Sequence, residues 1–246
     1  MQLLSPPVCI IQANTKRMKK LLLFLTIAWI YGPVRAQSAL KPDEKNGLIS
    51  VTVTDYQGKA RAGDEIIFEG LKTRGKVSGF TDAEGKLDLL LPKGDTYRIL
   101  IASIGEQKEY SQVRVPDEPG EYSGRVKIKY ELPASITLQD VLFETGSATL
   151  SASSNKSLDE LAAFMKRKTT MEIEVAGHTD NVGNAEANLT LSQKRAEAVR
   201  NYLLRKGIHP SRVKAKGYGQ DSPVADNGTE EGRRKNRRTE IHILKQ

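Results

Sequence analysis

The sequence predicts two domains of different fold class: an N-terminal all-β sandwich at residues 47–132 and a C-terminal α/β domain at residues 133–246. The first range contains short segments of alternating, often β-branched residues between turn sequences, which is typical of strands in a sandwich. The second range alternates such segments with helical periodicity, in the order βαβαββ. A length of 246 residues accommodates two small domains of this kind.

The start of the chain has the pattern of an export signal. The basic group Met18-Lys19-Lys20 precedes an apolar run at residues 21–30, and Val34-Arg35-Ala36 has small residues at the positions that precede a cleavage site. A transmembrane anchor is the alternative, but a spanning helix needs about 20 apolar residues. We therefore expect a signal peptide at residues 1–36, with Met18 as a better start than Met1. The exported protein is expected in the periplasm or in association with the outer membrane.

The net charge of +8 could suggest a nucleic-acid partner. Much of it belongs to the predicted signal peptide, which contains no acid and the bases Lys16, Arg17, Lys19, Lys20 and Arg35. Without that segment the chain is close to neutral, so we expect no nucleic-acid partner. The only cysteine, Cys9, lies in the same segment. The exported chain would therefore have no disulfide scaffold, no zinc finger and no thiol nucleophile.

After a short linker at residues 37–46, the N-terminal domain is expected to have strands at residues 48–53, 65–68, 87–91, 97–101 and 125–130. The alternating bases of the last segment indicate a half-exposed strand with a solvated face. The segments that resemble carboxypeptidase-regulatory-like or transthyretin-like sandwiches are Thr81-Asp82-Ala83-Glu84-Gly85, Leu91-Pro92-Lys93-Gly94 and Thr96-Tyr97-Arg98-Ile99. This resemblance implies a spacer or a binding module.

The C-terminal domain is expected to begin with a strand at residues 136–143. Ser153-Ser154-Asn155 can cap a helix with apolar residues at helical spacing, namely Leu158, Leu161, Ala162 and Met165. Asn188 is expected to cap a second helix that ends near Lys206, with Gly207 closing it. Further strands are predicted at residues 171–176, 213–218 and 239–244.

Asp180 and Arg195 are the charged pair that the second domain singles out. Asp180 lies in a loop after a predicted strand, and Arg195 lies in the following helix, at the edge of a small and apolar stripe. No acid stands three or four residues from Arg195, so its guanidinium needs a partner outside its own helix. One interpretation is an Asp180–Arg195 salt bridge between loop and helix. The other is a site in which Arg195 binds a carboxylate and Asp180 an ammonium of one zwitterionic ligand.

Residues from about 136 to 246 resemble the OmpA C-terminal-like domain shared by outer-membrane protein A, peptidoglycan-associated lipoproteins and the flagellar stator protein MotB. The matching segments are Val141-Leu142-Phe143, Ser147-Ala148-Thr149-Leu150, Gly177-His178-Thr179-Asp180, Asn188, Leu191-Ser192, Arg195-Ala196, Gly217-Tyr218-Gly219, Pro223-Val224-Ala225 and Asn236-Arg237-Arg238. They cover a little under half of the chain.

This resemblance implies non-covalent binding of peptidoglycan through the diaminopimelate residue of its stem peptide. The residues that it implies as peptidoglycan contacts are Asp180, Arg195, Asn188, Thr179, Leu191, Gly146, Phe143 and Arg238. The free amine and carboxylate at one end of diaminopimelate complement one acid and one base. The chain departs from the family at Glu144-Thr145-Gly146, where the family often has Asp or Asn. This departure puts the family's side-chain contacts from this loop in question, whereas backbone contacts can carry over.

Other chemistries have little support in the sequence. The histidines His178, His209 and His242 lack the spacing of a metal site, and no G-x-S-x-G nucleophile elbow occurs. We expect no cofactor, no metal and no catalysis. The basic run at residues 233–238 could suggest a nucleic-acid patch, but Glu230 and Glu231 precede it. Two alternatives remain, an envelope adaptor whose sandwich binds another protein and, third, a cell-wall hydrolase.

Overall fold

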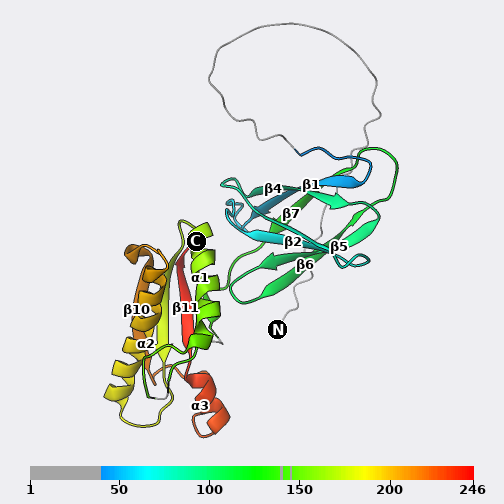
Figure 1. Cartoon of the computed structure of the whole chain (residues 1–246). Helices are drawn as coiled ribbons and strands as arrows, with labels where there is room; N and C mark the ends of the chain where they lie inside the picture. The colour runs from blue at the N-terminus through cyan, green and yellow to red at the C-terminus, as the bar shows by residue number, and fades with distance from the viewer. Residues whose placement is uncertain (1–39, 139–140, 145) are drawn as a thin grey trace, which may run out of the picture. The chain divides into compact units, whose positions relative to one another are not determined.

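The computed structural model describes residues 40–138, 141–144 and 146–246 (Figure 1). Several β-sheets and a few helices form two compact units, one mainly from residues up to Tyr130 and the other mainly from residues after it. The predicted signal peptide lies outside the described residues. Within the described ranges, every helix is too short or too polar to cross a membrane.

All regular elements among the described residues of the first unit are strands. They are β1 (Asn46–Thr54), β2 (Glu65–Gly70), β3 (Lys76–Phe80), β4 (Lys86–Pro92), β5 (Asp95–Ala102), β6 (Gln107–Val115) and β7 (Ser123–Lys129). One sheet has the order β4-β1-β7 and the other the order β3-β2-β5-β6. The sequence pattern missed β3 and β6, which are both edge strands with largely exposed, polar residues. Pairing with β2 and β5, rather than their own composition, makes them strands.

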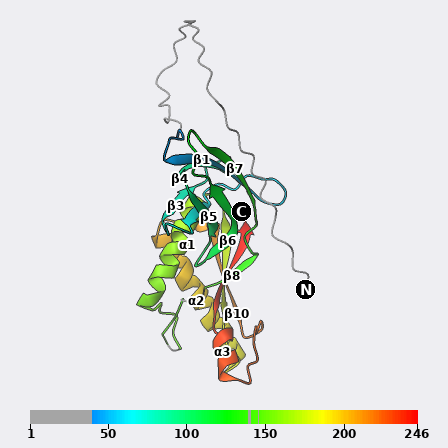
Figure 2. The same cartoon turned by 90° about the vertical axis from the view of Figure 1, so that its right-hand side faces the viewer.

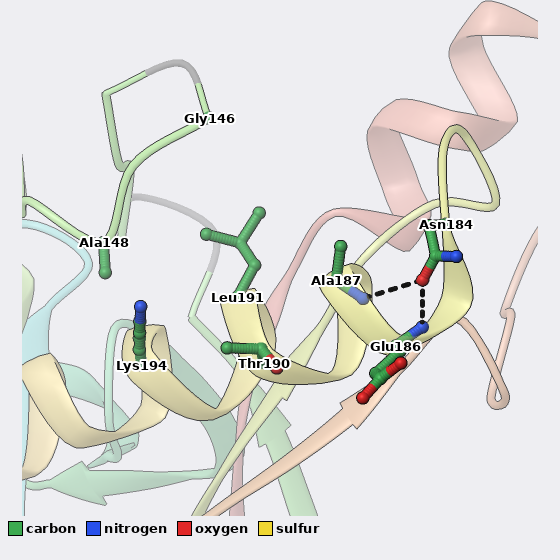
Figure 3. A pocket seen from close by; sticks show the side chains of 8 residues that line it. All are labelled: Gly146, Ala148, Asn184, Glu186, Ala187, Thr190, Leu191 and Lys194. Carbon is green, nitrogen blue, oxygen red and sulfur yellow. Dashed lines mark hydrogen bonds between the residues drawn. The ribbon is translucent and has the colours of Figure 1, made fainter.

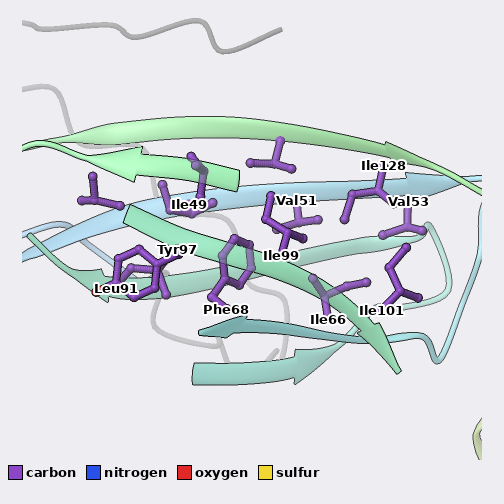
Figure 4. Close-up of a cluster of buried hydrophobic side chains, with 13 residues drawn as sticks. Ile49, Val51, Val53, Ile66, Phe68, Leu91, Tyr97, Ile99, Ile101 and Ile128 are labelled. Carbon is purple, nitrogen blue, oxygen red and sulfur yellow. The ribbon is translucent and has the colours of Figure 1, made fainter. Parts of the chain in front are cut away.

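The two sheets of the first unit share one hydrophobic core (Figure 4). Alternate residues of β1 are buried, as the alternation in its sequence predicts, and Ile49, Val51 and Val53 are at most 1% exposed. Phe68 and Tyr97 of the other sheet pack into the same cluster. The buried Tyr97 ring keeps its hydroxyl satisfied, because it donates a hydrogen bond to the Pro92 carbonyl at 2.8 Å. The two sheets of this unit therefore pack against each other through one core.

The second unit is a four-stranded sheet with helices. Its elements are β8 (Ser135–Thr137), α1 (Asn155–Arg167), β9 (Glu172–His178), α2 (Ala185–Arg205), β10 (Val213–Gly219), α3 (Glu230–Asn236) and β11 (Thr239–Lys245), with short 3-10 turns before α1 and β10. The sheet order is β10-β9-β11-β8, in which only the β9–β10 pair is parallel. Within this unit, α3 lies at one end of the sheet and the C-terminus lies at the other (Figures 1 and 2).

Three sequence predictions for this unit were wrong. Helix α3 was not predicted, so the order is βαβαβαβ rather than βαβαββ; its seven residues are polar and have no apolar periodicity. The cap of α2 is Asn184, whose side chain accepts hydrogen bonds from the backbone of Glu186 and Ala187, and not Asn188. The predicted strand at residues 136–143 is short, because β8 ends at Thr137 and Phe143 forms only an isolated bridge with Leu150.

Helix α2 lies unusually close to the sheet because two strand residues opposite it are glycines. A Cβ atom on Gly177 of β9 would lie 2.3 Å from the Ser192 carbonyl oxygen. A Cβ atom on Gly217 of β10 would lie 2.4 Å from the Gln193 nitrogen. Two hydrogen bonds join the same surfaces, from Gly217 N to Gln193 Oε1 and from Gly219 N to Ser192 Oγ. The buried stripe of α2, which the sequence predicted, is thereby fixed in register on the sheet.

We expect Gly177→Ala to destabilise the protein by about 1–3 kcal/mol, because the added methyl group overlaps helix backbone that has nowhere to move. Urea unfolding of the full-length protein measures the effect. Gly75→Ala is the control, because the nearest atom to its added Cβ, Thr73 Oγ1, lies at an ordinary 3.6 Å. Equal stability of Gly177→Ala and the wild type would contradict the close approach of α2.

Candidate functional site

Asp180 lies just beyond the end of β9 and is 8% exposed. Its Oδ1 atom accepts a hydrogen bond from the Val182 backbone at 3.1 Å, and its Oδ2 atom accepts one from Arg237 Nη1 at 2.6 Å. The predicted alternative of an Asp180–Arg195 salt bridge is therefore wrong. The partner comes from the C-terminal end of α3 instead, where the sequence pattern showed no helix.

Arg237 also holds Glu230, through a 2.9 Å contact between Nη2 and Oε1. One guanidinium thus ties the Asp180 loop to the start and the end of α3. Asp180 and then Glu230 raise the pKa of Arg237, since both hydrogen-bond its charged form. The only sequence signal for this role was the place of Arg237 in the basic run that precedes β11.

Arg195 projects from α2 and is partly buried. Its Nε donates a hydrogen bond to the Ser147 carbonyl at 3.0 Å, and its guanidinium carbon lies 5.1 Å from the centre of the Phe143 ring. Among the described residues, no carboxylate lies within salt-bridge distance of Arg195, and its two terminal nitrogens make no hydrogen bond. Burial and then the charge of Arg237 lower its pKa, whereas Asp180 raises it. Arg195 is thus an oriented, partly buried cation that has no carboxylate partner among the described residues.

Asn188 and Thr179 support the site rather than line it. The Asn188 side-chain amide donates hydrogen bonds to the carbonyls of Asp180 and Val182 and to Gln220 Oε1, at 3.2, 3.1 and 2.9 Å. Thr179 is 4% exposed, its backbone N–H donates to the Gly219 carbonyl, and its hydroxyl has no partner among the described residues. Both residues fix the loop that presents Asp180.

A cavity of about 950 Å³ brings together four of the predicted contacts, Phe143, Gly146, Arg195 and Arg238. The cavity is also lined by the basic residues Arg234, Lys235 and Arg237, which were not predicted as contacts from the sequence. Glu240 is the only acid among the described lining residues, and it binds Arg238 Nε at 2.6 Å. Apolar residues such as Leu142 and Val224 complete the wall. The cavity is therefore suited to an anionic ligand with apolar parts.

A second, shallower hollow of about 690 Å³ lies along the exposed side of α2 (Figure 3). It contains Leu191, another predicted contact, and it shares Gly146 with the basic cavity. In Figure 3, Leu191 points toward the loop that carries Gly146, and Lys194 points toward Ala148. The predicted contact residues thus lie in three places: the basic cavity, the hollow along α2, and the Asp180 loop with the residues that fix it.

His178 lies at the end of β9, two residues before Asp180, and is 3% exposed. Its ring stacks on Tyr218 with centroids 5.3 Å apart, and its Nε2 is 3.8 Å from Glu240 Oε2, too far for a hydrogen bond. Burial, followed by the charge of Arg238, lowers the pKa of His178 to about 4, against the opposing effect of Glu240. In the described ranges, no three potential ligands are placed to hold a metal ion.

Comparison with known proteins relates the second unit to a family. Residues 142–237 match the OmpA family, a range that includes most of the cavity and both Asp180 and Arg195. The chain is 37% identical over 202 residues to "Probable lipoprotein YiaD" of Escherichia coli K12, a match that covers 78% of this chain and 89% of that protein.

Three further relatives each match less than half of this chain. "Outer membrane porin F" of Pseudomonas fluorescens is 43% identical over 42% of this chain, which spans about a third (32%) of that relative's length. "Peptidoglycan-binding protein ArfA" of Mycobacterium bovis is 34% identical over 44% of this chain and 33% of its own length. The crystal structure of the peptidoglycan-associated lipoprotein from Burkholderia pseudomallei has 31% identity and a TM-score of 0.40, covering 46% of this chain and 91% of that one.

We expect the His178 imidazole to titrate near pH 4 rather than near its ordinary value of 6.5, with the neutral form at pH 7. Arg238→Gln should raise this pKa, because it removes a positive charge that disfavours the protonated ring. Nuclear magnetic resonance of the labelled histidine rings measures both values. Lys245→Gln, at the far end of β11, serves as the control and should leave the titration unchanged. A wild-type midpoint above pH 6 would contradict the burial of this ring.

Proposed function

Because this chain belongs to the OmpA family, we propose that its second unit binds peptidoglycan without covalent chemistry and tethers the protein to the cell wall. The ligand group is the end of a diaminopimelate side chain, with its free amine and carboxylate. The main support for the proposal is that Arg195 is a partly buried guanidinium without a carboxylate partner among the described residues, in a basic cavity whose Arg237 is bound to Asp180.

Arg195 supplies the carboxylate half of this recognition. Its Nε is already used on the Ser147 carbonyl, and the Phe143 ring supports one face of the guanidinium. The two terminal nitrogens remain for a charge-assisted contact with a ligand carboxylate. Because the guanidinium is already oriented, little side-chain freedom is lost when the ligand binds.

Asp180 supplies the ammonium half. An ionised carboxylate offers about four lone-pair positions, and here one oxygen accepts from Val182 and the other from Arg237. A ligand ammonium can share the remaining positions without displacing Arg237. The Asn188 amide keeps the loop in place while this happens, because it holds the carbonyls on either side of the loop's turn.

The relatives support a binding role in the cell envelope. One of them, 34% identical over 109 residues, is named a peptidoglycan-binding protein, and others are named outer-membrane proteins. We accordingly propose an exported protein at the periplasmic side of the outer membrane. Its first unit would act as a spacer or as a docking module for another envelope protein.

Arg195→Ala and Asp180→Ala should each weaken binding to diaminopimelate-type sacculi at least about 30-fold, since truncating one member of a desolvated charge contact costs about 2–5 kcal/mol. Co-sedimentation with purified sacculi measures the bound fraction. Arg205→Ala, an exposed base in the last turn of α2, is the matched control and should bind like the wild type. Lysine-type sacculi, which lack the second carboxylate, should bind the wild type weakly. Arg195→Ala should bind these sacculi as weakly as the wild type does.

Unchanged sedimentation of both folded variants would refute the assignment of Asp180 and Arg195. Release of soluble wall fragments by the wild-type protein would instead show hydrolysis. Circular dichroism of each variant establishes that it is folded before binding is compared.

A further inference from the structure

The basic residues of the cavity are not equivalent, because most of them already have a carboxylate. Arg237 is bound to Asp180 and Glu230, and Arg238 is bound to Glu240. Lys235 lies 2.9 Å from Glu231 on its own helix. Arg234, like Arg195, lines the cavity with no carboxylate at salt-bridge distance among residues 40–138, 141–144 and 146–246. Among the described residues, the cavity therefore contains two cations, Arg195 and Arg234, that form no salt bridge with a carboxylate.

Arg234 is presented by a helix that is fixed at several points. The Thr229 hydroxyl caps α3 by accepting from Gly232 N at 3.0 Å. The Asn236 side chain accepts from Val224 N and Ala225 N and donates to the Ala225 carbonyl. Arg237, three residues after Arg234, fastens the end of the helix to Asp180. The backbone end of the Arg234 side chain therefore has a defined position, next to Arg237 on one side of the helix.

We propose that Arg234 forms a second carboxylate subsite in this cavity, so that the site takes a stem peptide through two separate carboxylates. This inference rests on the proposed function, in which Arg195 binds the carboxylate of diaminopimelate. The second carboxylate is one of those that a stem peptide carries outside the diaminopimelate side chain, on its glutamate or at its free C-terminus. Cross-linking or amidation of that group removes its charge, so the site favours stem peptides that are neither cross-linked nor amidated there.

The two subsites differ in strength. Arg195 is partly buried and oriented, whereas Arg234 is exposed. An exposed ion pair is screened by water and salt, so Arg234 should contribute about a two- to fivefold preference rather than most of the affinity. Raising the salt concentration should reduce this preference more than it reduces the contribution of Arg195 to the binding affinity.

Calorimetry with two soluble peptides tests the proposal on the full chain. Both contain alanine, glutamate, diaminopimelate and alanine; one has all carboxylates free, and the other has the glutamate and terminal carboxylates amidated. The wild type should bind the free acid about two- to fivefold more tightly. Arg234→Gln should lose this preference and bind the amidated peptide as the wild type does. Arg205→Gln, which also removes an exposed arginine from the last turn of a helix, should keep the preference.

The possible failures are distinguishable. Equal wild-type affinity for both peptides, or a preference that survives in Arg234→Gln, overturns the Arg234 subsite while peptidoglycan binding stands. Equal weakening of both peptides by Arg234→Gln also overturns it, because a single carboxylate would then be contacting both arginines. If neither peptide binds the wild type and Arg195→Ala changes nothing, the proposed function itself fails.

Discussion

The close contact of α2 with strands β9 and β10 is the constraint on which the site depends. Gly177 and Gly217 leave no side chain between helix and sheet, and the helix backbone occupies that space. This contact sets where Arg195 leaves the helix, while the end of the same strand β9 sets where Asp180 begins. The two charged groups are therefore positioned by one rigid interface rather than by a direct bond between them.

The electrostatics of the unit follow from an incomplete pairing of charges. Four carboxylates, those of Asp180, Glu230, Glu231 and Glu240, engage Arg237, Lys235 and Arg238. Among the described residues, Arg195 and Arg234 line the same cavity without a salt bridge to any of these acids. A folded protein tolerates such an excess where a ligand supplies the missing anion, which makes incomplete pairing a more informative feature than the net charge of the chain.

Much of the fold could be predicted because alternation and helical spacing report burial directly. The buried stripe of α2 and the alternation of β1 are examples. Strands β3 and β6 and helix α3 could not be predicted in this way, because their residues are exposed and polar. Pairing or capping with distant segments orders them instead. The lack of a helical partner for Arg195 was visible in the sequence. The pairing of Asp180 with Arg237 was not, because it joins residues 57 positions apart through an unpredicted helix.

The place of β8 in the sheet has a mechanical consequence if the second unit binds the wall as proposed. The candidate site lies where β9 ends and β11 begins, while the chain toward the first unit leaves from the opposite end of β8, whose Ser135 pairs with His242. Tension between wall and first unit would therefore run along the strands and load the β8–β11 hydrogen bonds in shear, all at once. That edge strand has only three residues, so it is the element expected to detach first under load.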